Sequence, residues 1–138
     1  MRELRTERVT LTSVFAEPRA IDALDPGAAV LCRIAPDEAL LVGGAPAGGV
    51  ADPHAVVLDV TDGWSVFALS GDTPRSAFAY VSAVPLPDEG FVQGDVAHVP
   101  VKVIVERDAI RFLVPSMWGE YLRDRILEDC PDTVEDAR

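Results

Sequence analysis

Residues 69–81 (LSGDTPRSAFAYV) place a glycine, two hydroxyl side chains and an acid ahead of an expected helix, a combination that can hold a phosphate group. A phosphate-binding loop of the P-loop type needs further glycines and a Lys before its Ser or Thr, and a dinucleotide-binding turn needs G-x-G-x-x-G. Neither spacing is present. Gly71, Thr73 and Pro74 are instead typical of a strand-to-helix turn, with Thr73 as the helix cap and Pro74 at the first helical position.

The other side chains capable of chemistry stand alone. His54 and His98 have no acid one helical turn away and no neighbouring cysteine, so we expect them in surface loops. Ser116 has no identifiable base and is expected to cap a helix. Trp64 and Trp118 could stack on a flat ligand, but their apolar neighbours favour core positions.

Paired carboxylates, which can do acid–base work, occur at two predicted turns. Asp59 and Asp62 bracket one turn, and Asp37 and Glu38 lie in another. Since turns recruit Asp for local hydrogen bonding, we interpret these acids as turn residues. We therefore predict no catalytic, cofactor-binding or metal-binding residue in this chain.

Charge and cysteine usage restrict the class of protein. The formal net charge of −11 over 138 residues argues against nucleic acid or an anionic membrane as a partner, and it fits a basic partner or good solubility. Cys32 and Cys130 are too few for a disulfide framework and lack zinc-ligand spacing, so we expect free thiols. With no apolar run of about 18 residues and no secretory signal, we expect a cytoplasmic protein.

The first half of the chain gives weak signals for regular structure. We expect one domain over residues 1–138, with an acidic tail over residues 131–138. The expected elements are a strand over residues 9–14, a short helix over 17–24, a hairpin over 29–42, and a flexible linker or loop over 43–53.

The second half gives clearer patterns. The segments VVLDV and WSVFAL read as two strands that meet in a tight turn at Asp62 and Gly63. The helix that begins near Pro74 should bury Ala77 and Phe78 and end before Pro85.

A second hairpin over residues 99–114 has the most definite register. With Arg107 and Asp108 in the turn, one side carries only apolar pairs, namely Val105 with Ile110, Val103 with Phe112, and Val101 with Val114. The other side is a mixture that we expect to be mostly solvated: Lys102, Ile104, Glu106, Arg111 and Leu113.

The helix after Ser116 should bury one stripe made of Trp118, Leu122, Ile126 and Cys130. Leu127 points away from that stripe. Because Ile104 and Leu113 also lie opposite the apolar pairs, we interpret Ile104, Leu113 and Leu127 as a candidate interface with another protein. The predicted class is α+β, an antiparallel sheet covered by helices that begin near Pro74 and Met117.

Residues 56–127 carry a family resemblance in the order and spacing of their motifs: VVLDVTDGWSVFALSGDTPRSAFAYV, GFVQGD and VPVKVIVERDAIRFLVPSMWGEYLRDRIL. These resemble the gamma subunit of heterotetrameric sarcosine oxidase, a family related in fold to the folate-binding domain of the glycine-cleavage T-protein. RIAPDEALLV is a fainter match upstream. The resemblance implies a T-protein-like single domain.

Two departures from these families affect any site. Pro115 takes the place where the gamma family often has an Arg before its Ser. The T-protein's Asn-Glu-Asp-Gly-Gly stretch, used around folate and catalysis, has no counterpart, since Gly43 and Gly44 are followed by Ala and Pro. The resemblance thus implies the architecture of a one-carbon enzyme without its active-site residues.

Two functions follow from the resemblance. The first is a noncatalytic subunit without independent activity, which docks on larger flavoprotein subunits of an amine-oxidising complex; FAD, FMN and tetrahydrofolate would belong to those partners. The second is a free-standing folate-binding or one-carbon-transfer protein with a T-protein-like cleft.

Overall fold

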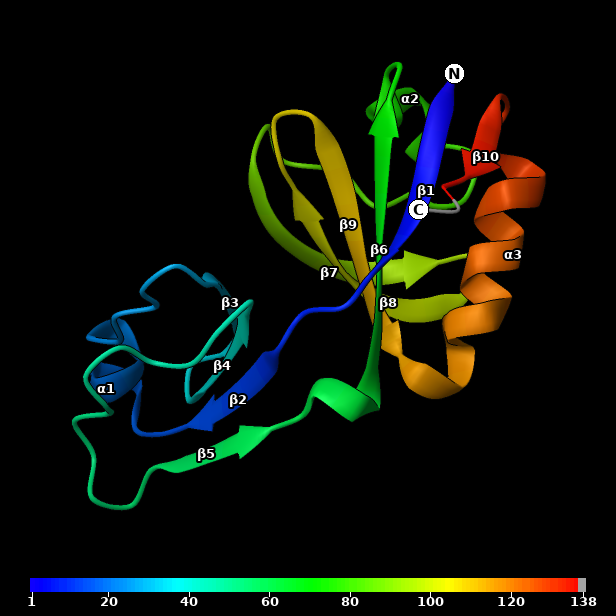
Figure 1. The fold of residues 1–138 in the computed structure, drawn as a ribbon. Helices are drawn as coiled ribbons and strands as arrows, with labels where there is room; N and C mark the ends of the chain where they lie inside the picture. Colours follow the sequence, from blue (N-terminus) through cyan, green and yellow to red (C-terminus); the bar gives the residue numbers. More distant parts are fainter. Residues whose placement is uncertain (137–138) are drawn as a thin grey trace. The chain divides into compact units, whose positions relative to one another are not determined.

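The computed structural model describes residues 1–136 of a chain that forms two compact units. The first unit comprises Met1–Arg8 and Gly63–Arg138, and the second comprises Val9–Asp62. Each unit contains one sheet with mainly antiparallel pairing and a few short helices (Figure 1). The predicted α+β class with antiparallel sheets is confirmed. None of the helices within residues 1–136 has the length and apolar character that crossing a bilayer requires.

The sheet of the first unit has the strand order β10-β1-β6-β9-β8-β7. Its strands are β1 (Arg2–Glu7), β6 (Trp64–Gly71), β7 (Gly90–Val96), β8 (Val99–Val105), β9 (Ala109–Pro115) and β10 (Thr133–Glu135). The helices of this unit are α2 (Pro74–Phe78), the 3₁₀ turn η2 (Ser116–Trp118) and α3 (Gly119–Asp129). Val103 pairs with Phe112 and Val105 with Ile110, which confirms the predicted hairpin register.

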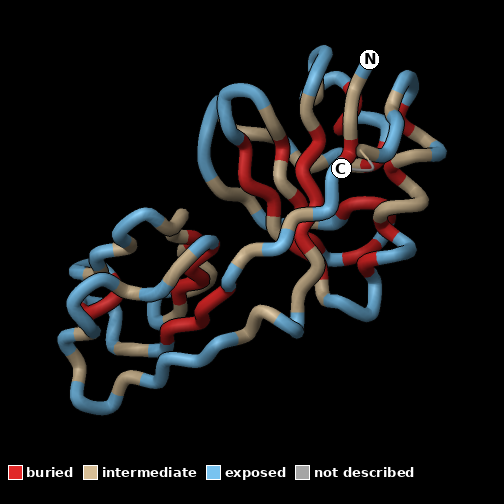
Figure 2. Tube along the Cα trace, in the orientation of Figure 1, coloured by how far each residue is buried: buried red, intermediate tan, exposed pale blue. Residues whose placement is uncertain are grey.

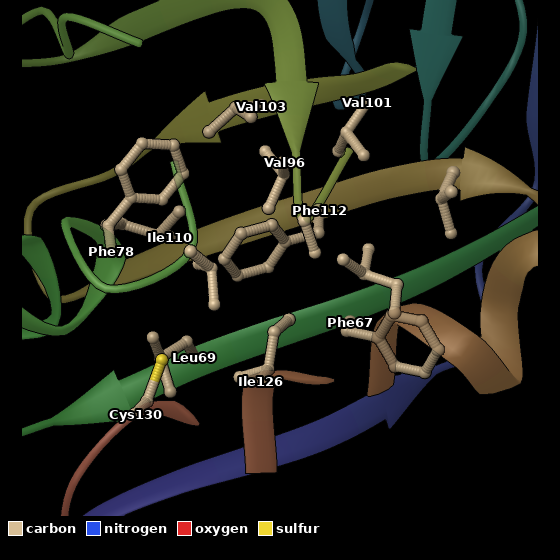
Figure 3. Packing of buried hydrophobic residues seen from close by; sticks show 14 of the residues in the cluster. Phe67, Leu69, Phe78, Val96, Val101, Val103, Ile110, Phe112, Ile126 and Cys130 are labelled. Atoms are coloured by element: carbon tan, nitrogen blue, oxygen red, sulfur yellow. The ribbon is translucent and has the colours of Figure 1, made fainter. Parts of the chain in front are cut away.

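One face of this sheet is covered by α2 and α3. Leu122 and Ile126 of α3, together with Phe78 of α2, join the buried cluster around Phe112 (Figure 3). The rings of Phe78 and Phe112 stack with centroids 5.9 Å apart and an interplanar angle of 21°. Figure 3 also shows Cys130, just beyond α3, beside Leu69 of β6. The predicted covering of the Val103 and Phe112 face by these two helices is confirmed.

The two ends of the chain meet in strand pairing that the sequence did not indicate. β1 lies between β6, to which it runs antiparallel, and β10, to which it runs parallel. The Arg2 N–H donates to the Asp132 carbonyl at 2.8 Å, and Leu4 is 1% exposed. Thr133–Glu135, expected within an acidic tail, therefore forms an ordered strand, while residues 137–138 of that tail lie outside the described residues.

The second unit is a four-stranded sheet in the order β3-β4-β2-β5. Its elements are β2 (Leu11–Phe15), α1 (Pro18–Asp22), β3 (Val30–Ala35), β4 (Glu38–Val42), β5 (Val56–Asp59) and the first residues of the 3₁₀ turn η1 (Thr61–Gly63). Val14, Ile21 and Leu41 belong to its buried cluster. The predicted first strand, helix and hairpin of this half are found with shifted ends. Residues 43–53 form no helix or strand and lead from β4 towards β5.

The predicted turn between β5 and β6 is wrong. β5 pairs with β2 in one sheet, whereas β6 pairs with β1 and β9 in the other. Gly63 does not adopt the positive φ of a tight hairpin turn; η1 separates the strands instead. In consequence β5 is the end strand of its sheet and is exposed along its length (Figure 2).

Candidate functional site

The turn between β7 and β8 has unusual backbone geometry. Ala97 has a φ of 50° and His98 a φ of 69°, so two consecutive residues with side chains occupy the left-handed region that favours glycine. Other parts of the first unit hold this turn in place. The Ala97 N–H donates to the Val81 carbonyl at 2.7 Å, and the Tyr121 hydroxyl donates to the Ala97 carbonyl at 2.9 Å. A strained conformation of this kind persists only where its surroundings enforce it.

An open groove of about 720 Å³ lies beside this turn. It is lined by α2, the chain that follows α2, and the turn itself: Arg75, Phe78, Ala79, Tyr80, Val81, Ser82, Ala83, Val84, Leu86 and His98. The Ser82 hydroxyl fixes the wall by donating to the Asp95 carbonyl at 2.7 Å. The Arg75 guanidinium donates to the carbonyl groups of Pro87, at 2.6 Å, and Leu86, at 3.1 Å.

The lining of this groove suits binding better than bond-breaking chemistry. Arg75 carries a permanent positive charge and the Tyr80 ring is exposed, which together favour a flat, anionic ligand. His98 lies in a loop, as predicted. Within residues 1–136, no cluster of three or more His, Cys, Asp or Glu side chains could hold a metal ion.

The three candidate interface residues are not exposed as expected. Ile104 is 3% exposed and Leu113 is 0% exposed, while Leu127 is half-buried and packs against the core of the first unit. The prediction that the second side of the hairpin is mostly solvated is therefore wrong. Assembly through these three residues stays an untested prediction.

The charged residues on that second side are paired across strands. The Arg111 guanidinium lies 2.9 Å from the Glu7 carboxylate and 3.6 Å from the Glu106 carboxylate. Lys102 Nζ lies 4.9 Å from the centroid of the Trp64 ring. Polar residues that alternate along a strand predict solvent exposure only when they have no such partners. The partner Glu7 could not be foreseen, because it lies on β1 and the sequence of β1 does not indicate a strand.

Asp59 closes a local turn, as predicted, whereas Asp52 closes one turn and also bonds to the distant Glu17. Asp59 Oδ1 accepts hydrogen bonds from Thr61 Oγ1 at 2.6 Å and from the Thr61 N–H at 3.0 Å, and these bonds lower the pKa of Asp59, the hydroxyl contributing most. The Asp52 carboxylate accepts from the backbone N–H groups of Glu17 and His54, both at 2.9 Å, and these bonds lower its pKa. Both carboxylates are therefore occupied as ionised acceptors.

Two predicted helix-capping roles and one predicted core position are wrong. Thr73 has a φ of 40° and makes no capping hydrogen bond; its hydroxyl accepts from Arg2 Nη2 at 3.3 Å. Ser116 is the first residue of η2, and Pro115 holds the N-cap position expected for it. Trp118, expected in the core, is 43% exposed and makes an edge contact with Tyr121 at 6.3 Å between centroids. The 3₁₀ turn before α3 rotates Trp118 off the buried stripe.

Both cysteines are free and buried, as expected. Burial raises the pKa of the Cys130 thiol to about 11, and its Sγ lies 3.3 Å from the Ala77 carbonyl, to which it can donate. A thiol with such a pKa is protonated at neutral pH, so Cys130 packs as a small apolar residue and does not act as a nucleophile.

The sequence reasoning missed an exposed aliphatic surface on β5. Val56, Val57 and Leu58 are 47%, 47% and 48% exposed. The run of β-branched residues correctly predicted a strand. It could not predict that this strand lies at the exposed edge of its sheet, because an inner strand has the same kind of sequence.

The fold is similar to that of two solved structures. Heterotetrameric sarcosine oxidase from Corynebacterium sp. U-96 matches with a TM-score of 0.77 at 17% identity, over 94% of this chain and 83% of that one. The glycine cleavage system aminomethyltransferase T from Bartonella henselae matches with a TM-score of 0.65 at 14% identity, over 97% of this chain and 47% of that one. The chain thus spans about half the length of the aminomethyltransferase. No protein-family model and no curated protein sequence match the chain.

Proposed function

We propose that this chain is the noncatalytic small subunit of a heteromeric, flavin- and folate-dependent amine-oxidising complex, similar to sarcosine oxidase. The observation that carries the proposal is the fold match over 94% of this chain to a chain of the heterotetrameric sarcosine oxidase. FAD, FMN and tetrahydrofolate belong to the larger partner subunits in this proposal, and no residue of this chain is assigned to them.

The chemistry of the individual side chains supports a structural role. The carboxylates of Asp52 and Asp59 accept backbone and hydroxyl hydrogen bonds, and the Cys130 thiol stays protonated at neutral pH. Gly43 and Gly44, at the place where the T-protein family has its acidic stretch, are followed by Ala and Pro. The strongly acidic surface and the exposed aliphatic side chains of β5 are features that a docking subunit can use.

The experiment is co-expression with the large flavoprotein subunits of a sarcosine oxidase-type complex, followed by gel filtration and a sarcosine oxidation assay. We expect this chain to elute with the large subunits, and we expect the isolated chain to be colourless and without oxidase activity. Elution apart from the large subunits would refute the proposal, as would a stoichiometric yellow chromophore on the isolated chain.

The second candidate function is folate binding or one-carbon transfer by the free chain, and the groove beside the β7–β8 turn favours it. Arg75 there offers a positive charge and Tyr80 an exposed ring to a flat, anionic pteridine derivative. Calorimetry with tetrahydrofolate tests this function directly. Saturable binding would favour the second candidate if Tyr80→Ala abolishes it and Trp118→Ala does not. Trp118 is the control because it is an exposed aromatic residue outside the groove lining.

A further inference from the structure

The exposed edge of β5 is short and ends in the charged Asp59, but it has no Lys, Pro or bulge to protect it. β5 is the end strand of the four-stranded sheet, and all four of its residues, Val56–Asp59, are exposed. Proteins usually protect such an edge with Lys, Pro or a bulge, because its free N–H and C=O groups can pair with another chain. The VVLD sequence contains no Lys or Pro, and its pairing with β2 runs without a register shift.

The direction of the backbone groups along β5 follows from its pairing with β2. The Val60 N–H, just after the strand, donates to the Leu11 carbonyl at 2.9 Å. Because backbone groups alternate in direction along a strand, those of Val56 and Leu58 also point towards β2. The N–H and C=O groups of Val57 and Asp59 therefore point to the open edge, where an added strand would bind.

The charge around this edge identifies the kind of strand that fits. Residues 9–62 contain eight acidic residues and two arginines. Asp52 and Asp59 flank or end the strand, and their hydrogen bonds, from the Glu17 N–H and the Thr61 hydroxyl respectively, keep the pKa of each carboxyl low. Pairing β5 with the β5 of a second copy would bring two such acidic units together, which like-charge repulsion opposes.

We propose that the open edge of β5 binds an extended, basic segment of a partner subunit by strand addition. The segment would alternate β-branched residues, which pack beside the exposed valines and Leu58, with Lys or Arg residues that face the surrounding carboxylates. This inference rests on the proposed function, since it names the surface on which the partner of the small subunit docks.

The test uses the full chain and two synthetic probes, a fluorescent KVTVKVTK peptide and its Lys-to-Glu counterpart, measured by fluorescence anisotropy. Val57→Pro removes the N–H that points to the open edge and leaves the hydrogen bonds to β2 in place. We therefore expect the fold to tolerate the substitution, while an added strand loses one hydrogen-bond donor. Val57→Lys places a repulsive charge at the same edge. Val57→Thr keeps the N–H and the β-branched shape and is the matched control.

We expect the basic peptide to bind the parent chain and Val57→Thr with similar affinity, and Val57→Pro and Val57→Lys at least tenfold more weakly. We also expect binding to weaken with added salt, and the acidic peptide not to bind. Equal binding of the basic peptide to Val57→Lys, equal binding of both peptides, or no binding of the basic peptide overturns the inference. So does a concentration-dependent dimer that Val57→Lys dissolves, since the occupant would then be a second copy.

The two proposals fail in different ways. If the Val57→Lys variant co-elutes with the large flavoprotein subunits as well as the parent chain does, strand addition at β5 is refuted and the subunit proposal stands. Peptide binding at β5 by a chain that never co-elutes with those subunits refutes the subunit proposal alone.

Discussion

At the scale of single residues, Gly71 is a position that both the backbone angle and a close contact reserve for glycine. Its φ is +101°, and a Cβ atom added there would lie 2.5 Å from the Met1 carbonyl oxygen. Gly71→Ala therefore combines an unfavourable backbone angle with a clash against β1, and we expect it to lower the free energy of unfolding by about 2 kcal/mol or more. Urea denaturation followed by circular dichroism measures the loss.

Gly63 provides the control for that substitution. It lacks a positive φ, and a Cβ added to it has no atom within 4 Å. Gly63→Ala should change the free energy of unfolding by less than about 0.5 kcal/mol. Equal losses for the two variants would contradict the proposed role of the contact between Gly71 and Met1.

The Cys130 thiol gives a prediction about pH. Burial raises its pKa from 9.0 to about 11, so between these values the unfolded chain releases the thiol proton while the folded chain keeps it. The stability contributed by the neutral thiol is complete below pH 9 and is lost as the pH rises towards 11. Unfolding free energies measured from pH 8 to pH 11 should fall more steeply for the parent chain than for Cys130→Ala. Parallel curves would show that Cys130 does not keep its proton.

At the scale of elements, the hairpin of β8 and β9 shows what local patterning can determine. Val103 and Val105 lie opposite Phe112 and Ile110, as the alternation of apolar residues predicted, because only one register buries every member of that side. The same alternation could not reveal the burial of Ile104, since burial depends on what lies against the other side of the sheet.

The missed elements depend on partners distant in the sequence. β1 has the sequence RELRTE with Leu4 as its one buried residue, so its strand character comes from pairing with β6, whose partner residues lie 59 to 69 positions away. β5 and β6 resembled a hairpin because both are β-branched runs beside an Asp-Gly pair, and local sequence cannot tell a hairpin from two strands of different sheets. The candidate groove was missed for the same reason, as it joins α2 to the distant His98.

Phe112 tests the packing of these elements. It is 0% exposed, contacts Phe78 of α2 and lies in the cluster that also holds Ile126 of α3. Phe112→Ala should lower the free energy of unfolding by about 3–5 kcal/mol, because the surrounding helices cannot fully close the cavity. Arg107→Ala, in the exposed turn of the same hairpin, should cost less than about 0.5 kcal/mol. A small loss for Phe112→Ala would mean that α2 and α3 do not form a fixed cover.

At the scale of the whole molecule, the first unit needs both ends of the chain. β1 lies between β6 and β10, and Leu4 belongs to the main buried cluster. A chain lacking residues 1–7 should therefore lose the cooperative thermal transition of the first unit, because an inner strand is missing from its sheet. A two-residue extension before Met1 should leave that transition in place, since it disturbs only the exposed pair of the terminal amine with Asp72. Calorimetry of both chains distinguishes the outcomes, and an unchanged transition in the shortened chain would contradict the topology.

The interrupted course of the first unit also sets an order of events during synthesis. Val9–Asp62 is continuous, so every strand of the second unit is translated before β6. β1 is made before its partners and can pair only after β6 and then β10, the last strand among residues 1–136, are translated. The polar RELRTE sequence of β1 keeps this waiting segment from presenting a long apolar surface to other nascent chains. The polar composition that obscured β1 as a strand therefore also limits aggregation of the nascent chain until β6 and β10 are available for pairing.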